Sequence, residues 1–222
     1  LNVSEGVLYT ITVVSSGGSS NSVTWMTAIR TSGLQLYQFS SGQRSGLQLN
    51  GPGGQAAVVS ASSSNIGTMD FYLEDVQHDN TITTTSSLSF EGAQFLNTTG
   101  ETWRNSYIDV PDRYVVGGLD ADYSASDFST QLGRITAGNA YDIPDDAVYA
   151  TKGSRVLIVK TQDGNLAKIE VVPDPTTGKL YSGSGTNKYV TVNVSYQPIA
   201  GQPYAARPHR GFSGRPVRIS AQ

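Results

Sequence analysis

The chain has 222 residues, a formal net charge of −3 at pH 7 and no cysteine. The missing cysteine excludes disulfide frameworks, thiolate metal sites and cysteine nucleophiles from this chain, and no apolar run approaches the length of a transmembrane helix. Ser, Thr and Gly supply 72 residues, while charged residues make up only 15%. With Val, Ile, Tyr and Phe scattered among them, this composition is typical of many short strands joined by turns.

Charge is distributed unevenly along the chain. Residues 1–198 carry 11 Lys or Arg against 18 Asp or Glu, whereas residues 199–222 carry four Arg and no acid. The acidic body repels phosphate backbones, which argues against nucleic acid as a partner. The basic end is typical of an interaction tail. We therefore expect a single β-rich domain over residues 1–198 and an extended Pro/Gly-rich tail over residues 199–222.

In the first half of the chain, β-branched and aromatic residues predict strands separated by Gly- and Ser-rich turns. The predicted strands cover residues 7–14, 23–29, 34–39, 47–49, 56–59, 69–73 and 81–85. Two more follow at residues 107–110 and 114–116. The one candidate helix covers residues 122–132, and its apolar spacing fits a helical face poorly.

The clearest pattern lies nearer the C-terminus. Two apolar runs, residues 155–160 and 166–171, flank an Asp163-Gly164 turn and predict a β-hairpin, because Asp-Gly tolerates the positive φ of a tight turn. Residues 189–196 alternate strictly, which predicts a strand with a dry face and a wet face. The dry face holds Val190, Val192 and Val194, and the wet face holds Thr191, Asn193 and Ser195.

These elements together predict the fold class. Strands greatly outnumber helices, and the helix–strand alternation of parallel α/β folds is missing. We therefore expect an all-β fold of mostly antiparallel sheets with at most one or two short helices.

Three segments resemble the HmuY-like family of secreted or surface-anchored haem-binding proteins. Residues 155–171 resemble the family's hydrophobic strand, Asp-Gly turn and Ala-Lys return strand, and residues 189–196 resemble its closing strand. Within residues 23–59, the stretch 23–30 resembles the family's tryptophan strand, and the Gly-rich loop and strand that follow also fit. The resemblance implies an all-β fold with long antiparallel strands and an extracytoplasmic location, whether periplasmic, cell-surface or secreted.

The resemblance also implies haem held between two axial side chains, usually His and sometimes Met. The segments that should supply them, roughly residues 97–111 and 138–144, contain neither. Tyr107 and Tyr141 are the candidate iron ligands there, because tyrosinate binds ferric iron. The alternative for both is a structural role in the core or at an interface. Haem is the one cofactor that the sequence suggests.

Patterns for catalysis and metal binding are missing. The chain has no Gly-x-Ser-x-Gly elbow and no phosphate-binding Gly-x-x-x-x-Gly-Lys-Ser/Thr motif. A calcium-loop-like start at Asp120 lacks the glycine and the final acid that such a loop needs. Asp142, Asp145 and Asp146 cluster around Pro144 and are candidates for a hard cation, but the cluster is more typical of a helix cap or a solvated loop. We therefore expect neither an enzyme nor a metal site.

The tail carries the residues best suited to a partner, and its prolines exclude a helix and a central strand. Aromatic side chains can anchor on a protein surface, and arginines can bind carboxylates or lipid phosphates. The candidate partner-binding residues are Tyr204, Arg207, Arg210, Phe212, Arg215 and Arg218.

Two functions follow from these observations. The first is a non-enzymatic extracytoplasmic interaction or accessory subunit of a larger surface or membrane-associated assembly. It would dock partly through its basic tail, onto other protein subunits or an anionic membrane surface. The second is a haem- or porphyrin-binding, hemophore-like protein, as the resemblance implies.

Overall fold

The structure is a computed structural model, and it describes residues 4, 6–65, 67–75, 86–96, 104–109, 119, 140–145, 153–202 and 218–221. Every strand pairing among them is antiparallel, so the predicted all-β class is confirmed. The helical segments described in full are single 3₁₀ turns at Phe39–Ser41, Pro52–Gly54, Ser63–Asn65, Ala93–Phe95 and Gly185–Asn187. The helix considered over residues 122–132 and the strands predicted over 81–85 and 114–116 lie outside the described residues.

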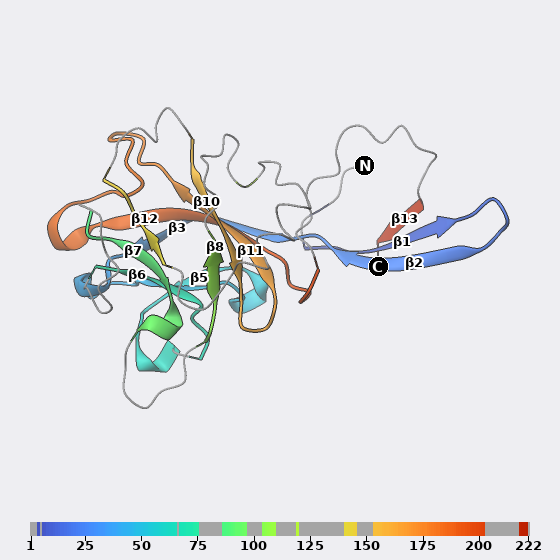
Figure 1. The fold of residues 1–222 in the computed structure, drawn as a ribbon, viewed down its shortest axis with the longest axis horizontal. Helices are drawn as coiled ribbons and strands as arrows, with labels where there is room; N and C mark the ends of the chain where they lie inside the picture. Colours follow the sequence, from blue (N-terminus) through green and yellow to red (C-terminus); the bar gives the residue numbers. More distant parts are fainter. Residues whose placement is uncertain are drawn as a thin grey trace.

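The strands form three sheets (Figure 1). Sheet B has the order β3–β12–β11–β10–β8 and contains Ile29–Tyr37 (β3), Tyr107–Asp109 (β8), Arg155–Lys160 (β10), Leu166–Val172 (β11) and Tyr189–Tyr196 (β12). Sheet C has the order β5–β4–β6–β7–β9 and contains Gly46–Gln48 (β4), Ala57–Val59 (β5), Phe71–Glu74 (β6), Ser89–Gly92 (β7) and Tyr141–Asp142 (β9). Sheet A has the order β13–β1–β2 and contains Leu8–Val14 (β1), Ser20–Met26 (β2) and Arg218–Ala221 (β13).

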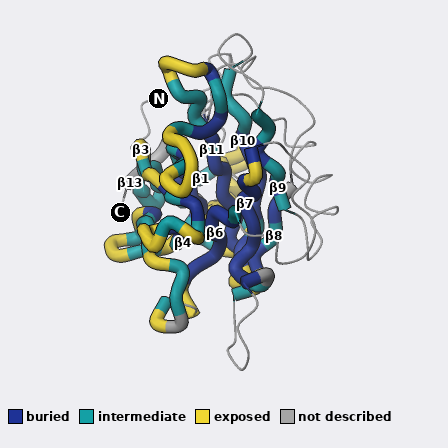
Figure 2. The backbone as a smooth tube through the Cα atoms, turned by 90° about the vertical axis from the view of Figure 1, so that its left-hand side faces the viewer, coloured by how far each residue is buried: buried dark blue, intermediate teal, exposed yellow. Residues whose placement is uncertain are grey.

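Sheets B and C pack face to face, because each turns an apolar side toward the other. The three valines predicted for the dry face, Val190, Val192 and Val194, are fully buried in a core shared with β6 and β7 of sheet C. In this core the rings of Phe71 and Phe90 stack with their centroids 5.5 Å apart. Figure 2 shows the buried backbone concentrated in the central strands of both sheets. The body of the protein is therefore a two-sheet β-sandwich.

Sheet A projects from this sandwich as an arm (Figure 1), and the name arm is used below for β1, β2 and β13. Cross-strand pairing places Ile11 opposite Val23 and Thr12 opposite Ser22, so the two pairs lie on opposite faces of the arm. Thr12 and Ser22 share a hydroxyl–hydroxyl hydrogen bond of 2.8 Å. The face that carries Ile11, Val13 and Val23 is called the apolar face below, and the opposite face carries the Thr12 and Ser22 hydroxyls together with Val14.

The predicted hairpin is confirmed as β10 and β11, which pair from Arg155↔Val171 to Lys160↔Leu166. The Thr161 N–H donates to the Asn165 carbonyl at 2.9 Å, and the Gly164 N–H donates to the Thr161 carbonyl at 2.9 Å. Gly164 has φ +81°, the left-handed conformation for which glycine is suited. The sequence therefore identifies both the hairpin and its turn.

Two of the predicted strands are wrong in their bounds. Residues 23–29 do not form one strand, because the chain leaves the arm at Thr27, whose hydroxyl donates to the Ser4 carbonyl at 2.6 Å and accepts from the Val7 N–H at 3.0 Å. The predicted strand at 34–39 is the second half of β3.

The expected wet face of β12 also fails at Ser195, which is fully buried. The outer face of sheet B is covered here, because the neighbouring Lys168 is only 3% exposed and donates to the Leu119 carbonyl at 3.4 Å. An alternating pattern predicts burial of one face only, so it cannot indicate a strand that is covered on both faces.

Candidate functional site

The two candidate iron ligands lie in different layers of the molecule. Tyr107 is half-buried in β8 and precedes Ile108, which points into the sandwich core, so its own side chain projects from the outer face of sheet B. Tyr141 lies in β9 of sheet C and is part of the core, with the Arg155 guanidinium 5.7 Å from its ring centroid. The fold therefore directs these two rings away from a common pocket.

Most of the predicted tail residues, Tyr204, Arg207, Arg210, Phe212 and Arg215, lie outside the described residues. Arg218 begins β13, where its backbone pairs with Thr12 of β1. β13 is an edge strand of the arm and contains none of the tail's prolines. The end of the tail and the N-terminal hairpin therefore form one structural unit.

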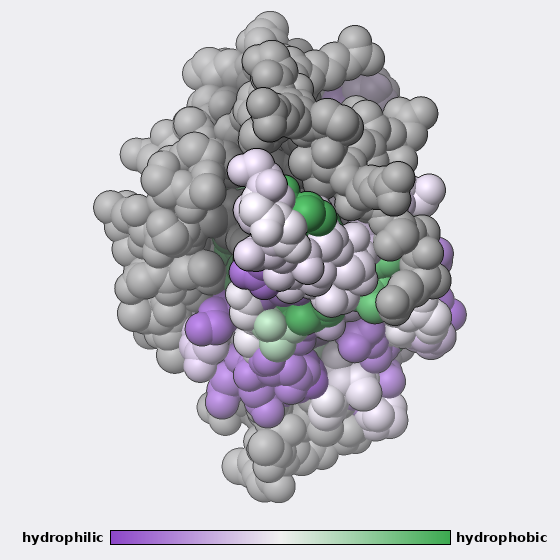
Figure 3. All heavy atoms as spheres, turned by 90° about the vertical axis from the view of Figure 1, so that its right-hand side faces the viewer, coloured by the Kyte–Doolittle hydropathy of each residue, from purple (hydrophilic) through white to green (hydrophobic). Residues whose placement is uncertain are grey.

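The arm carries the exposed apolar surface of the described residues. Val13, Val14 and Val23 are 61%, 65% and 57% exposed, whereas large apolar side chains in the sandwich are covered. Figure 3 views the molecule from the side on which the arm projects and shows apolar patches among weakly polar surface there. Residues 8–26 carry no charged side chain. Exposed apolar surface without charge is typical of an interaction site.

The outer edge of β2 is only partly closed. Near the base of the arm, the Gln202 side chain accepts from the Met26 N–H at 3.4 Å and donates to the Thr24 carbonyl at 3.0 Å. Gln197 adds a hydrogen bond of 2.8 Å to the Met26 carbonyl. The backbone N–H and carbonyl groups of Thr24 and Met26 thus point away from β1. Because these groups alternate in direction along an antiparallel strand, those of Ser20 and Ser22 point outward as well. Toward the tip, no residue in the described part of the chain pairs with this edge.

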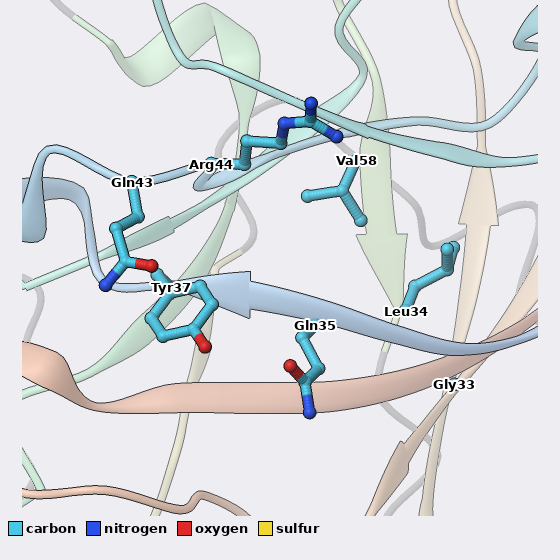
Figure 4. A pocket seen from close by; sticks show the side chains of 7 residues that line it. All are labelled: Gly33, Leu34, Gln35, Tyr37, Gln43, Arg44 and Val58. Carbon is cyan, nitrogen blue, oxygen red and sulfur yellow. The ribbon is translucent and has the colours of Figure 1, made fainter.

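A second candidate surface is a groove of about 510 Å³ beside β3 (Figure 4). Here the edge strand of sheet B lies near the edge strand of sheet C, so that side chains from separate segments meet. The groove is lined by Gly33, Leu34, Gln35, Tyr37, Gln43, Arg44 and Val58. The ring of Tyr37 packs against Tyr189 of β12 with the centroids 5.1 Å apart, which fixes one wall.

Arg44 is the charged member of the groove. Its main-chain carbonyl accepts a 2.9 Å hydrogen bond from the Tyr37 N–H, so the backbone on both sides of the groove is tied together. Figure 4 shows its guanidinium extending above Val58. Among the described residues, no carboxylate pairs with this guanidinium. The groove therefore offers an available positive charge.

Two buried ionisable groups of the body, Asp70 and Tyr72, are held by several contacts. Asp70 accepts from the Arg104 Nε–H at 3.0 Å, the Leu49 N–H at 2.9 Å and the Ser106 hydroxyl at 2.9 Å. On the outer face of sheet C, the Tyr72 hydroxyl lies 2.7 Å from Glu74 and 3.3 Å from Glu91. Burial, followed by the charge of Glu91 and the hydrogen bond to Glu74, raises the pKa of Tyr72.

The aspartates considered for a cation are placed only in part. Asp145 pairs with Lys179 Nζ at 2.6 Å and accepts from the Tyr181 hydroxyl, and these contacts lower the pKa of Asp145. Asp146 and the segment that begins at Asp120 lie outside the described residues. Within the part of the chain that is described, no three His, Asp or Glu side chains gather to hold a metal ion. A membrane-spanning helix is not found among the described residues.

The sequence analysis missed both candidate surfaces. The uncharged run at residues 8–26 was a usable indication of the arm. The groove had none, because three separate stretches of chain form it. Comparisons with protein-family models, curated proteins and solved structures find no match to this chain. Function must therefore be argued from these surfaces.

Proposed function

We propose that this protein is a non-enzymatic interaction or accessory subunit of a larger extracytoplasmic assembly. It docks through the arm, to which the C-terminal strand of the tail contributes. The observation that carries the proposal is the position of Val13, Val14 and Val23, which are exposed on a projecting, uncharged hairpin. Val13 and Val23 lie on the apolar face and Val14 on the opposite one, and burying such a side chain in a partner would stabilise a complex by about 1.5–3 kcal/mol for each fully covered residue.

The open edge of β2 supports the same proposal. Natural edge strands are commonly blunted by charged residues, proline or a bulge. β2 contains no charge and no proline, and its pairing with β1 is continuous from Leu8↔Met26 to Val14↔Ser20. An extended segment of a partner can add to such an edge by main-chain hydrogen bonds while its side chains pack on the apolar face.

The test compares two substitutions at Ser22. Ser22→Pro removes the outward N–H and the hydroxyl, whereas Ser22→Ala removes the hydroxyl alone, together with its bond to Thr12. We expect partner proteins that co-purify with the native chain, quantified by mass spectrometry, to be lost with Ser22→Pro and retained with Ser22→Ala. Circular dichroism checks that both variants fold. Equal retention by the two variants would argue against docking at this edge.

Truncation tests the contribution of the tail. The cut is placed after Gln202, because Gln197 and Gln202 hold the base of the arm. Removal of residues 203–222 should weaken partner retention and leave the sandwich folded. An unchanged set of co-purifying proteins would contradict a role for the tail.

Haem binding remains the second candidate, and it rests on the HmuY-like resemblance. Two of the segments that carry the resemblance, residues 155–171 and 189–196, form the consecutive strands β10, β11 and β12 of sheet B, whereas residues 23–30 lie mostly in β2 of the arm and the strand after the Gly-rich loop is β5 of sheet C. Haemin titration decides the question. A sharp Soret shift that disappears in Tyr107→Phe or Tyr141→Phe would favour haem binding, and a spectrum like that of free haemin would dismiss it.

A further inference from the structure

We propose that the groove beside β3 binds a short acidic peptide segment in an extended conformation. The segment adds to the open edge of β3 at Gln35 and places a carboxylate against Arg44. This site is separate from the arm, and it neither requires nor excludes docking there.

The first argument is the direction of the backbone groups of β3. The Gln38 N–H donates to the Lys188 carbonyl at 2.9 Å, so even-numbered residues of this stretch face β12. Gln35 is an odd-numbered residue and lies opposite Thr191 in a pair that is not hydrogen-bonded. Its N–H and carbonyl therefore face outward into the groove. Neither group has a hydrogen-bond partner among the described residues. An extended peptide can satisfy both at once.

The length of this open edge limits the ligand. At one end the Tyr37 N–H already donates a hydrogen bond to the Arg44 carbonyl. At the other, Gly33 has φ +72°, and its N–H donates to the Asn193 side chain at 2.9 Å where the ladder with β12 is irregular. The free edge therefore centres on Gln35, which suits a short segment rather than a long added strand.

The side chains around the edge suit alternating apolar and acidic residues. Leu34 and Val58 are half-buried and supply apolar contact, and Gln35 and Gln43 supply amides close to the Tyr37 ring. Successive residues of an extended peptide point to opposite sides. One side can therefore pack on the apolar residues while the other brings carboxylates to Arg44.

Charge sets the preference for an acidic segment. The Arg44 guanidinium has no carboxylate partner in the described part of the chain, so an incoming carboxylate displaces none. Arginine binds carboxylates through paired N–H groups, so the contact is directional as well as strong. An acidic saccharide could also pair with Arg44, but its hydroxyls do not repeat the spacing of N–H and carbonyl groups along an extended main chain, which the outward groups of Gln35 match. The main-chain edge favours a peptide.

The test uses a short blocked peptide of alternating valine and glutamate, with binding followed by amide chemical shifts of the full chain. We expect shifts at Gln35, Tyr37 and Arg44, and affinity that falls as salt is raised. Arg44→Gln should weaken binding about tenfold, in line with the loss of one charged hydrogen bond. The matched control is Lys160→Gln, which removes the same charge from β10, a strand separated from β3 by β12 and β11. It should leave the affinity unchanged.

The backbone contact is tested from both sides. Gln35→Pro removes the outward N–H, and Gln35→Ala keeps it, so only the first should abolish binding. Should Gln35→Pro fail to fold, the same peptide with its central amides N-methylated tests the contact on the wild-type chain and should not bind. Absence of shifts in the groove, or equal binding by the N-methylated peptide, would overturn the proposal. Tighter binding of free galacturonate that is insensitive to Gln35→Pro would overturn it in favour of a saccharide.

Discussion

At the scale of single residues, Asp70 inside the body contrasts with the polar groups of the groove. Asp70 is buried and accepts hydrogen bonds from three different residues. The Gln35 backbone and the Arg44 guanidinium lie at the surface and have no such partners within the described chain. Buried polar groups that are fully bonded stabilise one fold, whereas unsatisfied groups in a groove are available to a ligand.

Tyr196 leads to a prediction about alkaline pH. It is 2% exposed, and burial together with the charge of Asp70 raises its pKa to about 12. Between the ordinary tyrosine pKa of about 10 and this value, the unfolded chain releases the proton and the folded chain keeps it. Stability from this group is therefore complete below pH 10 and is lost as the pH rises toward 12. Urea unfolding at stepwise higher pH should show a falling free energy of unfolding, with a shallower fall in Tyr196→Phe. An identical slope in the two proteins would contradict this assignment.

At the scale of elements, the sequence predicts what local chemistry determines. The bounds of β10 and β12 match their predicted ranges because apolar runs, alternation and an Asp-Gly turn act within a few residues. The pairing of β3 with β12 is not predictable in this way, since it joins residues such as Leu36 and Val190 that are distant along the chain. The groove depends on that pairing, and for this reason Gln35 and Arg44 were not identified.

The β10–β11 turn allows a prediction about one glycine. A Cβ on Gly164 would meet the Ala200 Cβ at 3.9 Å, an ordinary contact, so the cost of a substitution comes from φ +81°. Gly164→Ala should lower the free energy of unfolding by about 1–2 kcal/mol. Gly164→Asn should cost less, because asparagine adopts the left-handed conformation more readily. Chemical unfolding of both variants checks the order, and equal losses would contradict a conformational origin.

At the scale of the whole molecule, the body and the arm differ in what they contribute to the hydrophobic core. The core clusters of the described residues draw their side chains from the sandwich and its loops, and none from β1 or β2. The arm joins the body through short contacts at its base, such as those of Gln197 and Gln202 with β2. Because the described core lies in the sandwich, we expect the arm to contribute little to folding stability.

This division predicts the result of removing the arm. Tyr9 and Trp25 are cross-strand partners, so an Asn-Gly turn can replace residues 10–24 while Met26 keeps its bonds to Gln197 and Gln202. The free energy of unfolding should stay within about 1 kcal/mol of wild type, because no core side chain is lost.

A core substitution serves as the reference for this change in the free energy of unfolding. Phe90→Ala should lower that free energy by about 3–5 kcal/mol, because it removes the ring that stacks on Phe71. The shortened protein should also lose its co-purifying partners and retain peptide binding in the groove. A loss of stability comparable to that of Phe90→Ala would mean that the arm is part of the folding unit, and its exposed valines would then need a structural explanation. Loss of groove binding together with partner binding would mean that the two surfaces act as one site.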